Sequence, residues 1–158
     1  MSVKKILTEP NKLLRQVSKA VVRVGDQERK LMDDMLDTMY AAPGIGLAAI
    51  QIGVPKRIIV MDISRDENKK EPRYFVNPVI KKKNEEKVKY EEGCLSVPDQ
   101  FAEIERPNTC EVEYLDYNGK KQILKADGLL ATCIQHEMDH LEGILFIDYL
   151  SKLKKSMI

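Results

Sequence analysis

The chain has 158 residues, 43% of them hydrophobic, and this length and composition predict one compact domain spanning residues 1–158. Lysine and arginine number 26 against 25 for aspartate and glutamate, so the charge balance gives no reason to expect direct recognition of nucleic acid or of an anionic membrane. No apolar run reaches the roughly 18 residues that span a bilayer, and residues 1–12 contain no hydrophobic signal core, so we expect a cytoplasmic protein.

Three cysteines, Cys94, Cys110 and Cys133, are present in the chain. An odd number without regular spacing indicates a reducing compartment rather than a disulfide framework. At least one of these thiols is therefore a candidate metal ligand or reactive group.

The first predicted element is an amphipathic helix over residues 26–40. Asp26 is the candidate N-cap, and Pro43 and Gly44 follow the end of the segment. Apolar residues recur at helical spacing, which predicts that one face of the helix enters the core. They are Leu31, Met32, Met35, Leu36 and Met39. We interpret the methionines as core filling rather than as a cofactor site.

The middle of the chain predicts short antiparallel strands. Runs with β-branched or aromatic residues are separated by Pro, Asn and Gly, and Asn118-Gly119 is a hairpin turn signal. The predicted strands are residues 57–63, 74–80, 86–91, 110–117 and 121–125. The polar stretch 64–71, between the first two of these strands, predicts a surface loop.

A second helix is predicted over about residues 127–142, with two adjacent arcs. One arc carries apolar side chains for the core, and the other carries side chains suited to a site. The first arc consists of Leu130, Ile134, Leu141 and Leu145, and the second of Leu129, Cys133, His136, Glu137 and His140. A helix, a run of strands and a closing helix predict an α+β fold, in which antiparallel sheets pack around a central C-terminal helix.

The closing helix contains the pattern His-Glu-x-x-His at residues 136–140. At roughly 100° per residue, two histidines four apart lie about 40° from each other, so both imidazoles can bind one metal ion. Glu137 is close enough to take a proton from a water on that metal. The same short pattern also arises by chance, and the three residues would then form an exposed cluster without a metal.

A catalytic metal held by two histidines needs a third protein ligand and an open position. The sequence has no other histidine, and Phe146 stands where the extended zinc-protease pattern has its third. The ligand must then be Cys, Asp or Glu: Glu142 and Asp148 are candidates, and Cys94, after a glycine in a loop-like setting, is a better one. A thiolate suits zinc and iron alike. The simplest alternative for Cys94 is a buried, inert thiol.

Three segments together resemble the peptide deformylase family closely. They are residues 44–51 (GIGLAAIQ), 92–96 (EGCLS) and 135–140 (QHEMDH). The segments stand in the family's order and at about its separations. The resemblance extends from Leu14-Arg15 to Asp148-Tyr149 and so covers nearly the whole chain.

The resemblance implies a metal site and a reaction. Cys94, His136 and His140 would bind the metal, which would be Fe²⁺ in the cell, while Zn²⁺, Ni²⁺ or Co²⁺ could replace it in isolated protein. The family removes the formyl group from the initiating methionine of nascent chains. With Glu137 as general acid and base, a metal-bound water would attack the formyl carbon and release formate. The amide of Gln51 and the backbone N–H of Leu95 would stabilise the oxyanion.

The resemblance also implies where the substrate lies. The glycines of Gly44-Ile45-Gly46 would let an extended peptide approach closely and pair as an added strand, although this segment alone reads as an ordinary turn. A deep apolar pocket would select methionine. The remaining predicted substrate-binding residues are Tyr90, Glu92, Gly93, Leu129, Thr132 and Cys133.

Two features depart from the best-known bacterial pattern. Phe101 stands where many members carry an arginine that helps to hold the substrate backbone, although Arg106 is present further on. Longer members extend a basic C-terminal helix linked with ribosome docking, whereas this chain ends at Ile158. The resemblance implies formylmethionyl nascent peptides as partners. The short C-terminal end leaves docking to the ribosome open.

Two other functions fit the metal motif alone. A metalloprotease would cleave internal peptide bonds, whereas only a deformylase would release formate. A structural metal domain would close the site with a fourth ligand such as Cys133, and its function would not depend on Glu137.

Overall fold

The computed structural model describes residues 2–64 and 68–150. Its elements in chain order are η1 (Lys12–Arg15), α1 (Asp26–Ala41), β1 (Gly46–Ala48), η2 (Ala49–Ile52), β2 (Ile58–Met61), β3 (Arg73–Lys83), β4 (Lys87–Cys94), β5 (Val97–Pro107), β6 (Thr109–Leu115), β7 (Lys121–Asp127), α2 (Gly128–Leu141) and η3 (Phe146–Tyr149), where η marks a short 3₁₀ helix. Residues 65–67 of the predicted loop and the C-terminal tail considered for ribosome docking lie outside the described residues. Within the described ranges, no helix has both the length and the apolar character needed to cross a membrane.

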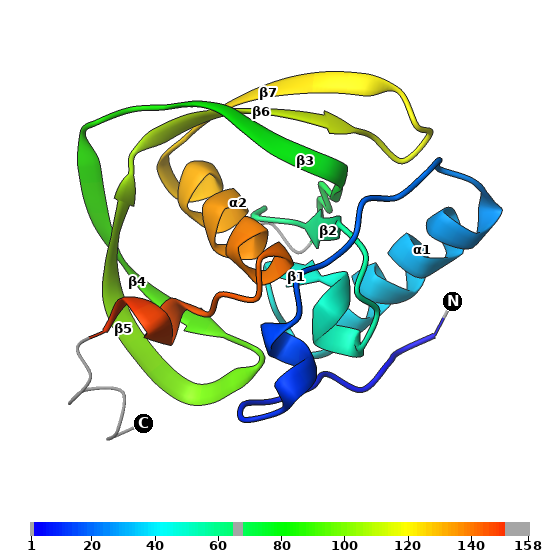
Figure 1. Ribbon diagram of the computed structural model, residues 1–158, viewed down its shortest axis with the longest axis horizontal. Coiled ribbons are helices and arrows are strands. Elements are labelled where there is room, and N and C mark those ends of the chain that lie inside the picture. The colour runs from blue at the N-terminus through cyan, green and yellow to red at the C-terminus, as the bar shows by residue number, and fades with distance from the viewer. Residues whose placement is uncertain (1, 65–67, 151–158) are drawn as a thin grey trace.

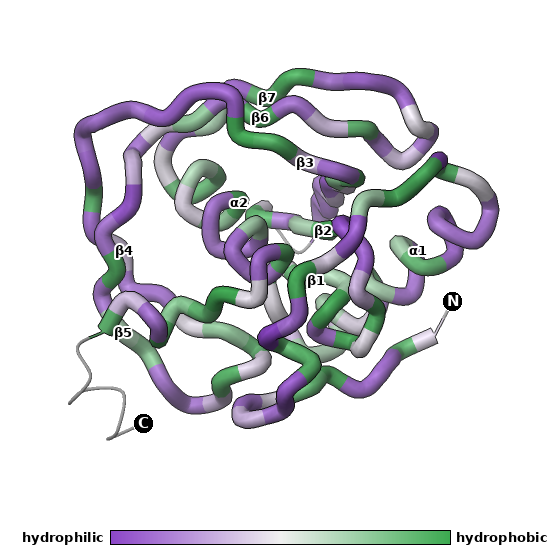
Figure 2. Tube along the Cα trace, viewed as in Figure 1, coloured by the Kyte–Doolittle hydropathy of each residue, from purple (hydrophilic) through white to green (hydrophobic). Residues whose placement is uncertain are grey.

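The strands form two antiparallel sheets, which confirms the predicted α+β class. Five strands pair in the order β1-β2-β3-β6-β7, and β4 pairs with β5 alone. The β4–β5 ribbon continues from β3 and β6 and bends around α2, which lies at the centre of the molecule (Figure 1). The bend between β3 and β4 is hydrophilic (Figure 2).

Strand β2 separates two apolar clusters, and alternation along the strand decides which side chain enters which cluster. Ile58 and Val60 pack with the methionines of α1. Ile59 and Met61 point to the opposite face and pack with the apolar side of α2. The methionines of α1 therefore fill the core, as predicted, and the sheet holds the two helices on opposite faces.

Helix α1 begins one position earlier than predicted, because the predicted N-cap, Asp26, already belongs to the helix. Gly25 is the N-cap, and Asp26 is the first helical residue. The carboxylate of Glu28 accepts a hydrogen bond of 2.8 Å from the backbone N–H of Gly25. This contact satisfies a backbone N–H at the start of the helix. The helix is therefore capped from Glu28 and not from Asp26.

Helix α2 ends at Leu141, so Leu145 does not belong to its apolar arc as predicted. Gly143 follows the helix with φ of +75° and turns the chain back toward η1. Leu145 instead packs with β5 and η3 in a third apolar cluster, with Val97, Ile104, Phe146 and Ile147. This cluster holds the last described segment against the β4–β5 ribbon.

Candidate metal centre and active site

Three ligand-type side chains from two elements converge beside α2. Cys94 is the last residue of β4, and His136 and His140 lie one turn apart on α2. The Cys94 Sγ and one ring nitrogen of each histidine all lie within 4.8 Å of one another, and Sγ is 3.3 Å from His140 Nε2. Bonds of about 2.0–2.3 Å to a tetrahedral metal would separate ligand atoms by about 3.3–3.8 Å. The donor positions therefore fit one cation after a small contraction.

The electrostatics of the two imidazoles also fit a cation. Burial, together with the charge of His136, holds the pKa of His140 well below its ordinary value. His140 is therefore the neutral form that binds metals. Burial also lowers the pKa of His136, but hydrogen bonds to Cys94 and Glu92 outweigh this effect and raise it to about 10. The site thus attracts positive charge at His136, where a metal would replace a proton.

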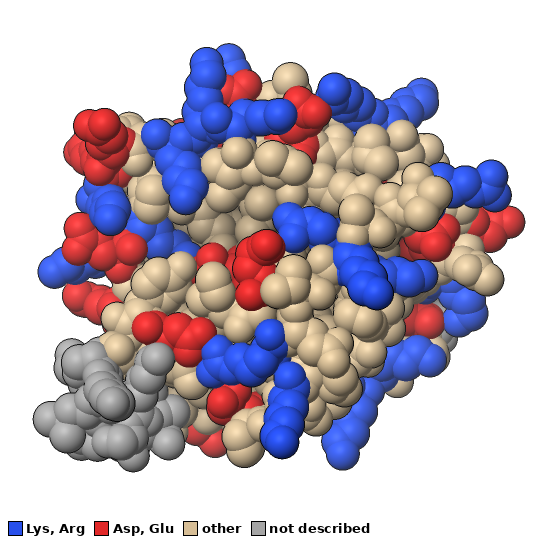
Figure 3. All heavy atoms as spheres, in the orientation of Figure 1, with Lys and Arg blue, Asp and Glu red and all other residues tan. Residues whose placement is uncertain are grey.

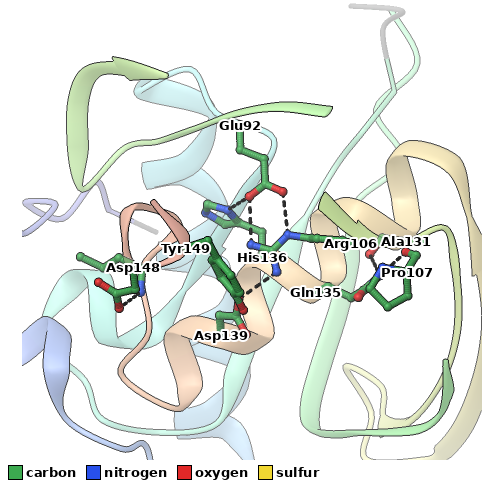
Figure 4. A network of polar contacts seen from close by, with 10 residues as sticks. Glu92, Arg106, Pro107, Ala131, Gln135, His136, Asp139, Asp148 and Tyr149 are labelled. Atoms are coloured by element: carbon green, nitrogen blue, oxygen red, sulfur yellow. Dashed lines mark hydrogen bonds and ion pairs between the residues drawn. The ribbon is translucent and has the colours of Figure 1, made fainter. Parts of the chain in front are cut away.

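A buried carboxylate fixes the orientation of His136. The imidazole Nδ1 lies 2.9 Å from Glu92 Oε1, so an Nδ1–H donates to Glu92 and leaves Nε2 for the site. Arg106 donates to both oxygens of Glu92, at 2.6 Å from Nε and 3.0 Å from Nη2. Figure 4 shows Glu92 between the imidazole and the guanidinium. Glu92 was predicted to bind substrate, but its two oxygens are engaged by His136 and Arg106.

Glu137 lies beside this cluster and is buried. The residue is 4% exposed, and its Oε1 has no hydrogen-bond partner among the described residues. Burial raises the pKa of Glu137 to about 7, although the charge of His136 opposes the shift. A carboxyl group with a pKa near neutrality can both accept and return a proton at physiological pH.

Gln51 and Ser96 complete the polar wall near the cysteine. The Gln51 Oε1 accepts a hydrogen bond of 2.9 Å from Ala48 N, and its Nε2 donates to Ser96 Oγ at 3.0 Å. The same Nε2 lies 3.6 Å from Cys94 Sγ. The amide is therefore held with its donor group facing the site. The role of Ser96 in holding Gln51 was not predicted.

Strand β1 forms the opposite wall, and its glycine is required by close packing. A Cβ on Gly46 would lie 2.5 Å from Glu137 Oε2, and a Cβ on Gly44 would lie 2.7 Å from Leu95 Cδ1. Gly46 is therefore needed for the close approach of β1 to Glu137, whereas the Leu95 side chain beside Gly44 can rotate away. Because β1 is an edge strand of its sheet, one side of it is available for an added strand.

Two cavities meet at Glu137 and His136. The larger, of about 620 Å³, is lined among others by Gly44, Gly46, Gln51, Cys94 and Leu95. The smaller, of about 100 Å³, extends from it along α2. The predicted pocket residues Tyr90, Gly93, Leu129, Thr132 and Cys133 all line the smaller cavity, together with Ile45 and Glu92.

Comparison with known proteins decides the family. The family model described as polypeptide deformylase matches residues 3–156. The chain belongs to the peptide deformylase family. A peptide deformylase of Pelagibacter ubique is 90% identical over 158 residues, which are 100% of this chain and 92% of that protein. A peptide deformylase of Rhizobium meliloti is 56% identical over 100% of this chain and 91% of its own length.

Solved deformylase structures share the fold. The crystal structure of peptide deformylase from Ehrlichia chaffeensis in complex with actinonin has a TM-score of 0.93 and 50% sequence identity, and the match covers 99% of this chain and 94% of that one. A deformylase structure from Legionella pneumophila has a TM-score of 0.93 at 44% identity, over 99% of this chain and 90% of that one. The chain is thus an enzyme of the deformylase family in both sequence and fold.

Phe101 lies at the mouth of the site. Its side chain is 67% exposed at the rim of the larger cavity and pairs in register with Gly93 across the β4–β5 ribbon. A Cβ on Gly93 would lie 2.6 Å from the Phe101 ring. An apolar surface therefore stands where the family resemblance led us to expect an arginine, whereas Arg106 is buried behind the site.

Proposed function

We propose that the protein hydrolyses the formamide of N-formylmethionyl peptides and releases formate and a free methionine N-terminus. The observation that carries the proposal is the meeting of Glu137, the Cys94–His136–His140 cluster and an open strand edge in one cavity. A metal cluster alone would suit many hydrolases. The open edge of β1 and the smaller cavity suit an extended peptide substrate whose first residue has an apolar side chain.

Cys94, His136 and His140 would hold the metal in this proposal. A divalent cation there would supply a lowered pKa for a coordinated water and polarisation of the formyl oxygen. The thiolate and imidazole donors suit iron as well as zinc, and we propose Fe²⁺ as the metal in the cell. Because ferrous iron and thiolates are both oxidisable, we expect activity to be preserved by preparation without oxygen.

Glu137 would move the proton that the reaction requires. The carboxylate takes a proton from the attacking water as the water oxygen bonds to the formyl carbon. The same proton then goes to the amine nitrogen as the carbon–nitrogen bond breaks, which leaves formate and the free amine. One group with a pKa near 7 serves both transfers.

Gln51 and Leu95 would stabilise the charge that develops on the formyl oxygen. The Gln51 amide is held by Ala48 and Ser96, and its second N–H, which now points toward Cys94 Sγ, would be the one that donates to the oxyanion. Leu95 lies in the turn between β4 and β5 and would contribute its backbone N–H. The edge of β1 at Gly46 would pair with the peptide backbone and set the distance to Glu137.

The methionine side chain would enter the smaller cavity. Leu129 and Cys133 supply apolar walls from α2, and Tyr90 closes the cavity from β4. The 100 Å³ volume admits a single side chain rather than a folded segment.

Replacing Glu137 by glutamine tests the proposal. We expect metal content to be unchanged, because the three donors remain, and formate release from formyl-Met-Ala-Ser to fall by about 100- to 10,000-fold. Formate and bound metal are measured on the same preparations. A variant with wild-type turnover, or a wild-type protein that cleaves unformylated protein instead, would overturn the proposal.

A further inference from the structure

A line of polar side chains leads from His136 away from the cavity to the last described helix, η3. Beyond the Glu92–Arg106 pair, Arg106 Nη1 donates to Asp139 Oδ2 at 2.8 Å. Tyr149 Oη donates to the same oxygen at 2.7 Å. Figure 4 shows Tyr149 and Asp139 on one side of the guanidinium and Glu92 on the other.

Arg106 is the fixed centre of this line. Its side chain is 5% exposed, so its charge must be compensated inside the protein. Glu92 accepts from Nε and Nη2, Asp139 accepts from Nη1, and the Tyr149 ring lies 5.0 Å from Cζ. Contacts on both edges and on one face leave the guanidinium a single orientation. The position of Glu92 therefore depends on what holds Arg106 from the η3 side.

Helix η3 is itself anchored at both the site and the N-terminal segment. The Phe146 ring stacks on the His136 ring at a centroid separation of 6.1 Å. Asp148 binds Arg15 Nη1 at 2.6 Å and accepts from Leu145 N at 3.0 Å. These contacts fix the start of η3, so Tyr149 is presented to Asp139 from a rigid base.

We propose that Tyr149 is a positioning residue for His136, acting through Asp139, Arg106 and Glu92. The inference rests on the proposed function only in taking His136 as a metal ligand. Partners behind a metal-bound imidazole set the ring orientation and its basicity, and their loss typically lowers metal affinity by about 10- to 100-fold. Tyr149 lies three contacts beyond Glu92 along this line, so its hydroxyl accounts for a smaller part of this effect.

The chain offers a matched control for the tyrosine hydroxyl. Tyr117 Oη contacts the carboxylate of Asp33 at 3.1 and 3.2 Å, a tyrosine–aspartate pair between the β6–β7 turn and α1. This pair lies outside the residues that line the two cavities of the site. Tyr117→Phe therefore removes the same kind of hydrogen bond without touching the line to His136.

The test compares Tyr149→Phe, Asp139→Asn and Tyr117→Phe with the wild-type protein. Zn²⁺ affinity is measured by chelator competition, and the visible spectrum of the Co²⁺-loaded protein reports the geometry of the thiolate and imidazole ligands. Thermal unfolding of the metal-free proteins measures any general loss of stability. None of these readouts requires turnover.

We expect Tyr149→Phe to weaken Zn²⁺ binding by about 3- to 10-fold and to shift the cobalt bands, and Asp139→Asn to do both more strongly. Tyr117→Phe should leave Zn²⁺ affinity and the cobalt spectrum unchanged. The stability of its metal-free form should fall about as much as that of Tyr149→Phe. Wild-type affinity and spectrum in Tyr149→Phe, whatever Asp139→Asn shows, would overturn the inference alone. A wild-type protein that binds no metal would overturn the proposed function as well.

Discussion

Gly46 shows how closely the site is packed at the scale of one residue. Its backbone lies against the carboxylate of Glu137, and no side chain fits between them. Glu137 is consequently held between α2 and β1, and an extended substrate on β1 would lie next to it. The absence of a side chain at residue 46 is thus part of the geometry that aligns carboxylate and substrate.

Gly46→Ala should disturb the position of Glu137 relative to the substrate and leave metal binding unchanged. The added methyl would meet Glu137 Oε2 at 2.5 Å and force the carboxylate to move. A displacement of about 1 Å at a reacting group can lower turnover by about 100-fold. We therefore expect formate release to fall by about 10- to 100-fold while metal content stays at the wild-type level.

Gly44→Ala is the matched control for this prediction. Its methyl would meet the end of the Leu95 side chain, which can rotate away, so the loss of turnover should be smaller. Equal formate release by Gly46→Ala and wild type would show that contact with Gly46 does not position Glu137.

The sequence predicts the histidine pair but not the residues behind it. Helical spacing alone places His136 and His140 on one arc, because a helix is a local structure. The contact between Glu92 and Arg106 joins residues that face each other across the β4–β5 ribbon. Such a contact depends on strand register, which local periodicity does not determine. The same limit applies to Cys94: its loop-like setting after a glycine made it a better candidate than Glu142 and Asp148, but only the family resemblance implied that it is the ligand.

At the scale of elements, Asp62 ties α1 to the sheet. It follows β2 and accepts hydrogen bonds from Tyr40 Oη at 2.5 Å, Ser64 N at 2.9 Å and Glu71 N at 3.0 Å. Burial raises the pKa of the Asp62 carboxyl, but the hydrogen bonds from these three residues outweigh burial and hold it below the ordinary value of 3.8. The folded state therefore favours the ionised form.

This shift predicts a pH-dependent contribution to stability. Between the folded and unfolded pKa values the unfolded state binds more protons, so stability rises with pH there. The contribution of Asp62 is complete above about pH 4 and is lost as the pH falls through the lower, folded value. We expect Asp62→Asn to lower the free energy of unfolding of metal-free protein by about 1–3 kcal/mol at pH 7.

Urea unfolding from pH 7 down to about pH 3 measures this effect. The difference between wild type and Asp62→Asn should narrow below pH 4. Glu85→Gln, an exposed carboxylate in the β3–β4 bend, should change stability little at any pH. A difference that stays constant across this range would contradict the role of the ionised Asp62.

The sequence analysis did not predict strand β5, because Arg106 interrupts its pattern of apolar residues. Along the strand, Ile104 and Arg106 are buried while Glu103 and Glu105 are exposed. This alternation in burial is typical of a half-buried strand. The sequence does not show it, because the buried arginine is a polar residue type. Strand β1 has three residues, all buried, and is too short to show any alternation. The other five strands and both long helices were predicted near their observed positions.

At the scale of the whole molecule, the fold brings distant segments to α2. The central helix receives β1 from one side and the β4–β5 ribbon from the other, so Cys94 meets histidines from far along the chain (Figure 1). The exterior carries basic and acidic side chains interspersed over the face seen in Figure 3, in line with a formal net charge of +1.

The central claim is that one cation bridges Cys94 on the ribbon and the two histidines on α2. Anomalous diffraction at the iron absorption edge, from crystals of protein prepared without oxygen, tests this most directly. The account predicts one strong peak about 2.3 Å from Cys94 Sγ and about 2.0–2.1 Å from a ring nitrogen of each histidine, distances typical of such ligands. An iron peak away from these atoms, or metal-free protein that still releases formate, would contradict it.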